Sequence, residues 1–275
     1  MPDNLNVTQF IMSFLEAIVL GIIQGLTEFL PISSSGHLEL GKFLLGIDAE
    51  ANFYFSVAVH GATALSTIVV LWKEVSSLAV GFFKFKWNDE TQYIAKIAVS
   101  TIPVVFVGFF MKDFVESFFT GSMILLSVAF ILTAALLFLT RFIKPEEKPV
   151  GFANSFIIGI AQAIAILPGI SRSGATIATG MLLGSKKSDI AKFSFLMALV
   201  PIIGANIVEA LSGDFAAAGG TSFAVIFAGF IAAFVSGYAA CKWMIDLVKK
   251  GNLMWFAVYV AIVGIFSFLL GINVF

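Results

Sequence analysis

The stretch QGLTEFLPISSSGH, residues 24–37, places polar groups inside an apolar surround. It contains a carboxylate, an amide, three consecutive serines and a histidine, while apolar residues lead into it from Phe10 and continue to Leu45. Polar side chains within a membrane segment are costly, and proteins that keep them use them for chemistry or transport. We therefore expect residues 24–37 to form part of a functional site within a membrane.

The same pattern returns in the second half of the chain. Residues 159–174 read GIAQAIAILPGISRSG, against GIIQGLTEFLPISSSG at residues 21–36. Ser33 falls on Ser171, at an offset of 138 positions that is constant along the alignment. The chain therefore contains an internal repeat of two related, interrupted stretches.

The composition identifies the class of protein. Hydrophobic residues make up 59% of the chain, charged residues only 12%, and the mean hydropathy is +1.01. A soluble domain carries about 25% charged residues, so the composition predicts an integral protein of the membrane bilayer. The net charge of −1 argues against a nucleic-acid partner, and the single cysteine, Cys241, excludes an intramolecular disulfide.

Several apolar runs are long enough to cross a bilayer, which requires about 20 residues. Six such runs are Phe53–Trp72, Ile94–Met111, Met123–Leu139, Ile190–Leu211, Phe223–Trp243 and Met254–Leu270. Two further regions, Phe10–Leu45 and Phe156–Leu183, are interrupted by proline, which ends a helix, and by serine, which caps a new one. Each of these regions is expected to form helix, break, helix, and either to cross twice or to turn back at mid-depth.

This count predicts the architecture. Each half holds one broken hairpin and three spans, and three is odd, so the second half is inverted relative to the first. We expect an all-α integral membrane protein with six transmembrane helices plus two broken or re-entrant helical hairpins in an inverted repeat. Residues 1–275 would form a single membrane domain, with repeats at approximately 10–140 and 151–275 joined by a cytoplasmic linker, 141–150.

Lysine and arginine divide unequally between the two faces of this topology. Thirteen of the 16 fall on one face, Lys42 and Lys112 fall on the other, and Arg172 lies in the second hairpin. An excess of positive residues marks the cytoplasmic side. We therefore expect a multi-pass protein with both termini outside and a site that opens to the outer side.

The two breaks share a feature suited to anions. Residues 33–36 and 171–174 each open a helix, and a helix N-terminus offers free N–H groups and about half a positive charge. Two such ends that converge would bind a strongly anionic group, and Arg172 adds a guanidinium whose fork fits phosphate oxygens. The alternative is that Arg172 only forms a salt bridge, for instance to Glu28, that locks the repeats together.

The first hairpin carries the acid–base groups. Gln24 and Glu28 are four residues apart and share a helix face, whereas the repeat counterpart of Glu28 is Ile166. Glu28 is suited to bind a divalent cation or to act as a general base, and Ser34 and His37 are spaced to meet as a nucleophile and its base. The plainer alternatives are a protonated carboxyl for Glu28, polar packing for Gln24 and a core position for His37.

These residues closely resemble the motifs of the undecaprenyl-diphosphate phosphatase family, also called bacitracin-resistance proteins, over nearly the whole chain. The motifs are [Glu/Gln]-x-x-x-Glu with Ser-Ser-[Ser/Thr]-Gly-His, found at 24–37, and Pro-Gly-x-Ser-Arg-Ser-Gly-x-Thr, found at 168–176. The resemblance implies a phosphatase of the bacterial cell membrane that hydrolyses undecaprenyl diphosphate to the monophosphate and inorganic phosphate, recycling the lipid carrier for cell-wall synthesis. It also implies a divalent cation, Mg²⁺ or Ca²⁺.

The resemblance assigns roles to single residues. Glu28, Ser34 and His37 would be catalytic, with Ser34 the favoured nucleophile and His37 its partner or acid, while Glu28 and Gln24 would serve the metal. Arg172 would clamp the phosphate, and the residues that hold the substrate with it would be Ser33, Ser35, Ser171, Ser173, Gly174 and Thr176.

A different function fits the same architecture. Secondary transporters also use inverted repeats and broken helices whose N-termini bind anions, so a transporter or flippase for a lipid phosphate or another anion is the alternative. Such a carrier has no need of Ser34 and His37 beside Glu28. The partner expected in either case is a polyprenyl phosphate lipid within the bilayer, and the oligomeric state is open between a monomer and a homodimer.

Overall fold

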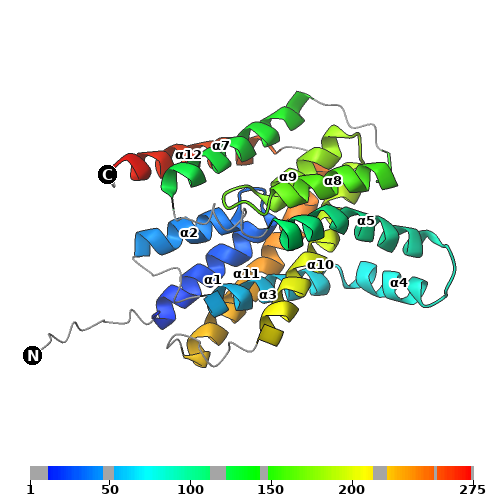
Figure 1. Ribbon diagram of the computed structural model, residues 1–275, viewed down its shortest axis with the longest axis horizontal. Coiled ribbons are helices and arrows are strands. Elements are labelled where there is room, and N and C mark those ends of the chain that lie inside the picture. Colours follow the sequence, from blue (N-terminus) through cyan, green and yellow to red (C-terminus); the bar gives the residue numbers. More distant parts are fainter. Residues whose placement is uncertain are drawn as a thin grey trace, which may run out of the picture.

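The computed structural model describes residues 12–45, 53–111, 122–142, 148–212, 222–250 and 253–273. Within these ranges the chain forms eleven α-helices and one 3-10 turn, η2 (Thr140–Phe142), and the one isolated β-bridge found there joins Lys148 to Ser185 (Figure 1). The predicted all-α class is therefore confirmed. The N-terminal residues 1–11, residues 143–147 of the expected linker and Lys112 lie outside the described part of the chain.

The helices follow one another along the chain with short connections. Their bounds are α1 (Phe14–Phe29), α2 (Ser34–Leu45), α3 (Phe53–Val70), α4 (Trp72–Phe82), α5 (Asp89–Phe110), α7 (Met123–Leu139), α8 (Phe152–Ile164), α9 (Arg172–Leu182), α10 (Lys187–Ser212), α11 (Phe223–Lys250) and α12 (Met254–Asn273).

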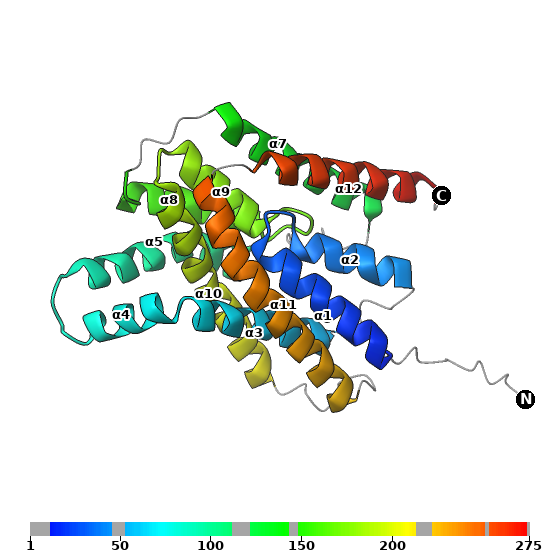
Figure 2. The same ribbon diagram turned by 180° about the vertical axis from the view of Figure 1, so that it is seen from behind.

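Both interrupted stretches form helical hairpins, as the sequence predicts. The pairs α1–α2 and α8–α9 are each separated by a short break, and their helices have 16, 12, 13 and 11 residues. These helices are shorter than the roughly 20 residues that a full crossing requires. Figures 1 and 2 show the two hairpins extending to opposite sides of the molecule, with both breaks at the centre. Of the two arrangements considered for these regions, the re-entrant one describes them.

The spanning helices differ from the prediction at one place. Helices α5, α10, α11 and α12, and α7 continued through η2, are long and apolar enough to cross a membrane. The run Phe53–Trp72 is not one straight span, because the chain bends by 79° between α3 and α4. The charged residue Glu74 follows the bend and pairs with Lys192 at 2.5 Å, which ties α4 to α10. The chain is thus a multi-pass membrane protein with five straight candidate spans and one bent pair.

Glycines allow the first helix of each hairpin to approach a long helix closely. Helix α1 packs along α11, where a Cβ on Gly21 would lie 2.3 Å from the carbonyl oxygen of Gly229. Helix α8 packs along α5, where a Cβ on Gly159 would lie 2.3 Å from the carbonyl oxygen of Ser100. Small residues at helix interfaces are typical of membrane proteins, because backbones can then come into contact. Each hairpin is therefore held mainly by a helix from the other half of the chain.

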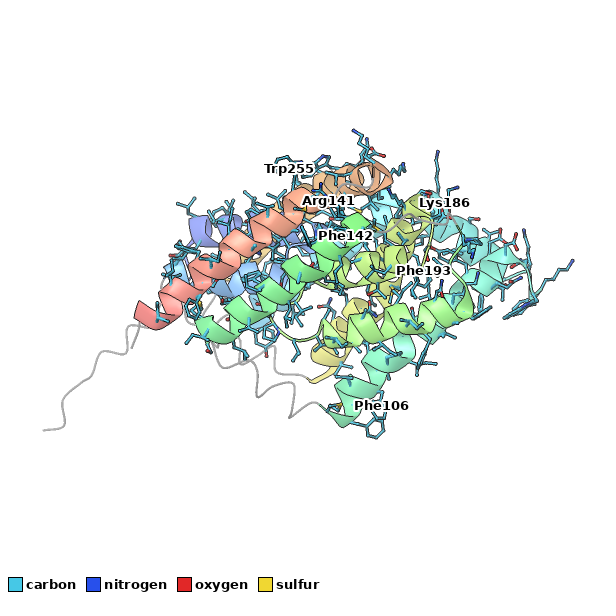
Figure 3. The ribbon with its side chains drawn as sticks, turned by 90° about the horizontal axis from the view of Figure 1, so that it is seen from above. Phe106, Arg141, Phe142, Lys186, Phe193 and Trp255 are labelled. Carbon is cyan, nitrogen blue, oxygen red and sulfur yellow. The ribbon has the colours of Figure 1, made fainter. Side chains whose placement is uncertain are left out.

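Large side chains fill the centre and cover the outside. Phe130 and Phe193 are fully buried between the hairpins and the long helices, whereas Phe106 is 55% exposed. In Figure 3 Phe193 lies inside the bundle, Phe106 points outward at one edge, and Arg141 and Lys186 lie toward the opposite edge. Apolar side chains on the outer surface are what a lipid environment requires.

Candidate functional site

Ser33 holds the first break in an uncommon backbone conformation. Its φ is +70°, in the left-handed region that residues other than glycine rarely adopt. The Ser33 hydroxyl accepts a hydrogen bond from the backbone N–H of Gly36 at 3.2 Å, and its carbonyl accepts one from the backbone N–H of His37 at 3.1 Å. Such conformations cost about 1–3 kcal/mol and gather at functional sites. Ser33 therefore both turns the chain and caps the start of α2.

Gly169 and Ser171 shape the second break. Gly169 has φ +88°, and a Cβ there would lie 2.7 Å from the side chain of Ala129, so both the conformation and the space require glycine. The Ser171 hydroxyl accepts from the backbone N–H of Gly174 at 3.0 Å and caps α9. The backbone N–H of Ser171 donates to the hydroxyl of Thr133 in α7 at 3.1 Å, which anchors the break to a spanning helix.

The two breaks touch each other directly. The Ser173 hydroxyl donates to the carbonyl oxygen of Leu30 at 2.9 Å. A Cβ on Gly36 would lie 3.1 Å from the Cα of Gly169, so the two backbones meet without intervening side chains. The N-termini of α2 and α9 are thereby brought to one place, where their free N–H groups favour negative charge.

Glu28 is the centre of the polar contacts at this place. Its carboxylate is buried, with 7% of the residue exposed, and forms an ion pair with the guanidinium of Arg172. The second carboxylate oxygen accepts hydrogen bonds from the Ser34 hydroxyl at 2.6 Å and from the Gln24 amide at 2.8 Å. Arg172 also donates to the carbonyl oxygen of Ala198 in α10 at 3.3 Å. One carboxylate therefore joins both hairpins, and the salt bridge that the locking alternative requires is present.

His37 has different partners from the one that its spacing suggests. Its Nδ1 lies 2.8 Å from the carbonyl oxygen of Ser33, and its Nε2 lies 2.9 Å from the hydroxyl of Tyr259 in α12. The Ser34 hydroxyl is directed to Glu28 instead. In this structure Ser34 is thus paired with a carboxylate, and His37 with a backbone carbonyl and a phenol.

The other predicted substrate-binding serines and threonine line the same breaks. Ser35 lies 3.4 Å from Ser33 and Ser173 lies 3.3 Å from Ser171, measured between hydroxyl oxygens. The Thr176 hydroxyl lies on the inner side of α9 and contacts that of Ser194 in α10 at 2.6 Å. The roles predicted for these hydroxyls stay predictions.

Three residues of the site were not singled out from the sequence. Tyr259 lies 222 positions from its partner His37, and no local pattern marks it. Thr133 interrupts the most apolar helix of the chain, and a hydroxyl in such a run is a usable signal of a polar contact. Ser194 is the repeat counterpart of Ser56, so the internal repeat contained a signal for it.

Two cavities adjoin the site. A small one, about 10 Å³, lies beside Glu28 and Arg172 and has room for about one water molecule. A larger groove of about 600 Å³ runs between α1, α2 and α12 and ends at His37 and Tyr259. The rest of its lining is almost wholly apolar and consists of Ile23, Leu26, Thr27, Leu30, Ile32, Leu40, Gly41, Leu44, Trp255 and Phe256.

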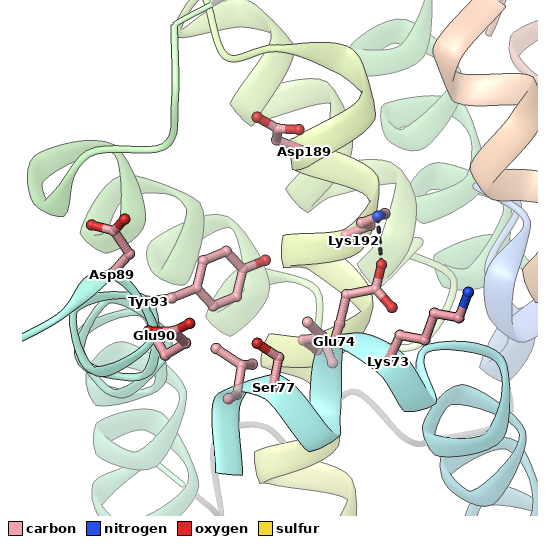
Figure 4. A pocket seen from close by; sticks show the side chains of 10 residues that line it. Lys73, Glu74, Ser77, Asp89, Glu90, Tyr93, Asp189 and Lys192 are labelled. Carbon is pink, nitrogen blue, oxygen red and sulfur yellow. Dashed lines mark hydrogen bonds and ion pairs between the residues drawn. The ribbon is translucent and has the colours of Figure 1, made fainter. Parts of the chain in front are cut away.

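A third cavity, about 410 Å³, lies between α4, α5 and α10 and is separate from the motif residues (Figure 4). Its charged lining includes the Glu74–Lys192 pair together with Lys73, Asp89, Glu90 and Asp189. In Figure 4 the Tyr93 ring lies between Asp89 and Lys192. No residue of either predicted motif lines this cavity.

The residues around Glu28 provide a modest set of metal donors. Among the residues that the structure describes, no group of three or more His, Cys, Asp or Glu side chains is placed to hold a metal ion. Gln24 is fully buried, and its carbonyl oxygen Oε1 has no hydrogen-bond partner. A carboxylate and a free amide oxygen fit a cation that takes its remaining oxygen ligands from a substrate phosphate, as Mg²⁺ commonly does.

Comparison with known proteins gives a consistent result along the chain. Residues 17–266 match the family described as bacitracin resistance protein BacA. A protein of Bacteroides fragilis named undecaprenyl-diphosphatase is 50% identical over 258 residues, which cover 92% of this chain and 97% of that protein. Proteins of the same name from Christiangramia forsetii and Methanosphaera stadtmanae are 51% and 35% identical, over 92% and 95% of this chain and 97% and 99% of their own lengths.

Proposed function

Because this chain belongs to the bacitracin resistance protein BacA family, we propose that it is an undecaprenyl-diphosphatase, which converts undecaprenyl diphosphate to undecaprenyl phosphate and inorganic phosphate. The observation that carries the proposal is the contact of Ser34 and Arg172 with the single buried carboxylate of Glu28, between two helix N-termini. Phosphoryl transfer needs positioning and compensation of negative charge, and these groups provide both.

The terminal phosphate would bind at the meeting point of the two breaks. The cavity beside Glu28 and Arg172 has room for about one water molecule, so a phosphate must displace part of the present contact. Arg172 can exchange Glu28 for phosphate oxygens, because a guanidinium binds either anion through two parallel hydrogen bonds. The N–H groups that open α2 and α9 would bind the remaining oxygens. Substrate binding would thus release Glu28 from its cation at the moment when a base is needed.

The contacts favour Ser34 as the nucleophile and Glu28 as its base. The Ser34 hydroxyl already donates to the Glu28 carboxylate at 2.6 Å, which is within reach for proton transfer. The Ser34 oxygen would bond to the terminal phosphorus, its proton would pass to Glu28, and the bond from that phosphorus to the bridging oxygen would break. The bridging oxygen would leave on undecaprenyl phosphate. Water would then hydrolyse the phosphoserine, which releases inorganic phosphate and restores Ser34.

A divalent cation is proposed to assist this site. Glu28 and Gln24 would hold it, and the amide oxygen of Gln24, which is buried without a partner, supports this assignment. A bound Mg²⁺ or Ca²⁺ would compensate negative charge on the diphosphate. The proton and the phosphoryl group would still be handled by Ser34, Glu28 and Arg172.

The large groove suits the lipid part of the substrate. It is lined almost wholly by apolar side chains and ends at His37, so an isoprenoid chain in the groove would place its diphosphate near the breaks. The distribution of lysine and arginine supports the orientation proposed from the sequence, with the site open to the outer side of the bacterial cell membrane. Lipid carriers of cell-wall synthesis release their diphosphate on that side.

The packing supports an inverted repeat. At the offset of 138 positions, α1 corresponds to α8 and α11 overlaps the counterpart of α5. The pair α1–α11 and the pair α8–α5 are among the most extensive helix contacts in the structure, and each joins one half of the chain to the other. Two halves related by a pseudo-twofold axis would produce this exchange of partners.

Phosphate release by the purified protein tests the proposed function. The protein in detergent would be incubated with a polyprenyl diphosphate, with and without EDTA, and inorganic phosphate would be measured. We expect release that falls on chelation and returns with Mg²⁺ or Ca²⁺. Absence of release under all conditions, together with movement of the lipid phosphate across a reconstituted vesicle, would instead support the transporter.

A further inference from the structure

The imidazole of His37 is fixed on several sides by groups that the motifs do not contain. Its ring lies parallel to that of Tyr259, with 5.6 Å between centroids and 10° between planes, and meets the Phe130 ring edge to face at 5.3 Å. Both ring nitrogens are within hydrogen-bond distance of a partner, Ser33 for Nδ1 and Tyr259 for Nε2. The ring therefore has one orientation, and α12 supplies half of what determines it.

The chemistry of these partners assigns the tautomer. A carbonyl oxygen only accepts hydrogen bonds, so Nδ1 of His37 must carry the proton that is shared with Ser33. In the neutral ring Nε2 is then an acceptor, and the Tyr259 hydroxyl donates to it at 2.9 Å. The lone pair that His37 can offer to any other group is thus on Nε2, and Tyr259 is the group that directs it.

Tyr259 also links this nitrogen to the groove. Tyr259 is 43% exposed, and it lines the groove beside Trp255 and Phe256 of the same helix. His37 is at the end of the groove that adjoins the breaks. The Tyr259 hydroxyl therefore lies where the apolar part of the groove meets the polar part of the site.

We propose that Tyr259 is a positioning residue of the hydrolytic site, which holds the Nδ1–H tautomer of His37 with Nε2 directed at the junction between groove and breaks. This inference rests on the proposed phosphatase function. Tyr259 acts through His37 and has no chemical step of its own. An aromatic ring alone can stack on His37, but only a phenol can also donate to Nε2, so the hydroxyl is the part that matters.

The first test measures the imidazole directly. The chain has two histidines, so ¹⁵N-histidine labelling gives two sets of ring signals, and His60→Gln assigns them. We expect Nδ1 of His37 to be protonated and Nε2 to be an acceptor that receives a hydrogen bond. In Tyr259→Phe the Nε2 signal should move toward that of a free acceptor while Nδ1 stays protonated. An unchanged Nε2 signal would overturn the proposal, whether or not the protein releases phosphate.

The second test separates positioning from a structural role. Tyr259→Phe should lower kcat about 3- to 10-fold, as expected for one lost hydrogen bond, with little change in KM because the ring still lines the groove. Combined with His37→Ala, it should cause no further loss beyond about twofold, since its effect passes through His37. Full additivity of the two losses would contradict the proposal. Tyr238→Phe, at a 40% exposed position on α11, is the matched control and should leave kcat unchanged.

Discussion

The ion pair between Glu28 and Arg172 makes a sharp prediction, because it is both a contact between the hairpins and the proposed chemical centre. We consider Glu28→Gln, which keeps the size and the hydrogen-bonding capacity of the side chain and removes only its charge. Side-chain exposure is 5% for Glu28 and 22% for Arg172, so the variant leaves a largely buried guanidinium without a counter-charge. Loss of one partner of a buried pair costs about 3–5 kcal/mol.

The partial exposure of Arg172 and its bond to the Ala198 carbonyl reduce this cost, and we expect about 3 kcal/mol. At about 2–4 °C per kcal/mol for a domain of this size, the unfolding midpoint of the protein in detergent should fall by about 6–12 °C. Phosphate release, measured below the new midpoint, should fall about 10²- to 10⁴-fold, because the base for Ser34 is lost.

Glu74→Gln is the matched control, since it removes a carboxylate from the other inter-helix ion pair, with Lys192. The side chains of this pair are 30% and 36% exposed, so its loss should cost less than about 1 kcal/mol and leave phosphate release unchanged.

A second comparison distinguishes a lock from a reaction centre. Arg172→Lys keeps the charge and a possible ion pair with Glu28, but an ammonium cannot bind phosphate through two parallel hydrogen bonds. If the pair only locks the hairpins, Arg172→Lys should retain activity per folded molecule, and Glu28→Gln should stay active at low temperature. Activity within about threefold of wild type in both variants would refute our assignment.

Three other predictions follow from the site, the topology and the packing. Ser34→Ala should abolish phosphate release and retain binding of the lipid diphosphate through Arg172; hydrolysis within about threefold of wild type would point to direct attack by water. In a Cys241→Ala background, an impermeant thiol reagent applied to intact cells should label a cysteine placed at Ser222 and not one at Lys186, and the reverse pattern would invert the orientation. Gly159→Val should cost about 1–3 kcal/mol, seen as a lower unfolding midpoint, because its Cβ would lie 2.3 Å from the Ser100 carbonyl; an unchanged midpoint would contradict the close packing of α8 on α5.

The sequence contained most of the site because its signals are local. Polar residues within an apolar run stand out, and Pro31 or Pro168 beside a serine marks a break, so both hairpins and their residues were predicted correctly in place. The partner of Ser34 was harder to predict. A spacing of three residues pointed to His37, yet the left-handed backbone at Ser33 and the turn before it place Ser34 against Glu28 across the break.

Contacts between distant parts of the chain left no such signal. Tyr259 is one of many aromatic residues in an apolar helix, and only the packing of α12 brings it to His37. The bend between α3 and α4 was missed for a similar reason. Hydropathy is high up to Trp72, but the direction of the next helix depends on the pair between Glu74 and Lys192, 118 positions apart.

The exchange of helix partners between the two halves has a consequence for biosynthesis. Helix α1 is among the first parts to leave the ribosome, but α11, against which Gly21 and Gly25 pack, follows about 200 residues later. At about 5–20 residues per second, this interval lasts about 10–40 s. Arg172 also arrives 144 positions after Glu28, so the carboxylate is without its cation for much of that time. An ionised carboxylate is unfavourable in lipid, so we expect the first hairpin to stay at the aqueous edge of the membrane until the second half is inserted, and to enter its final position late.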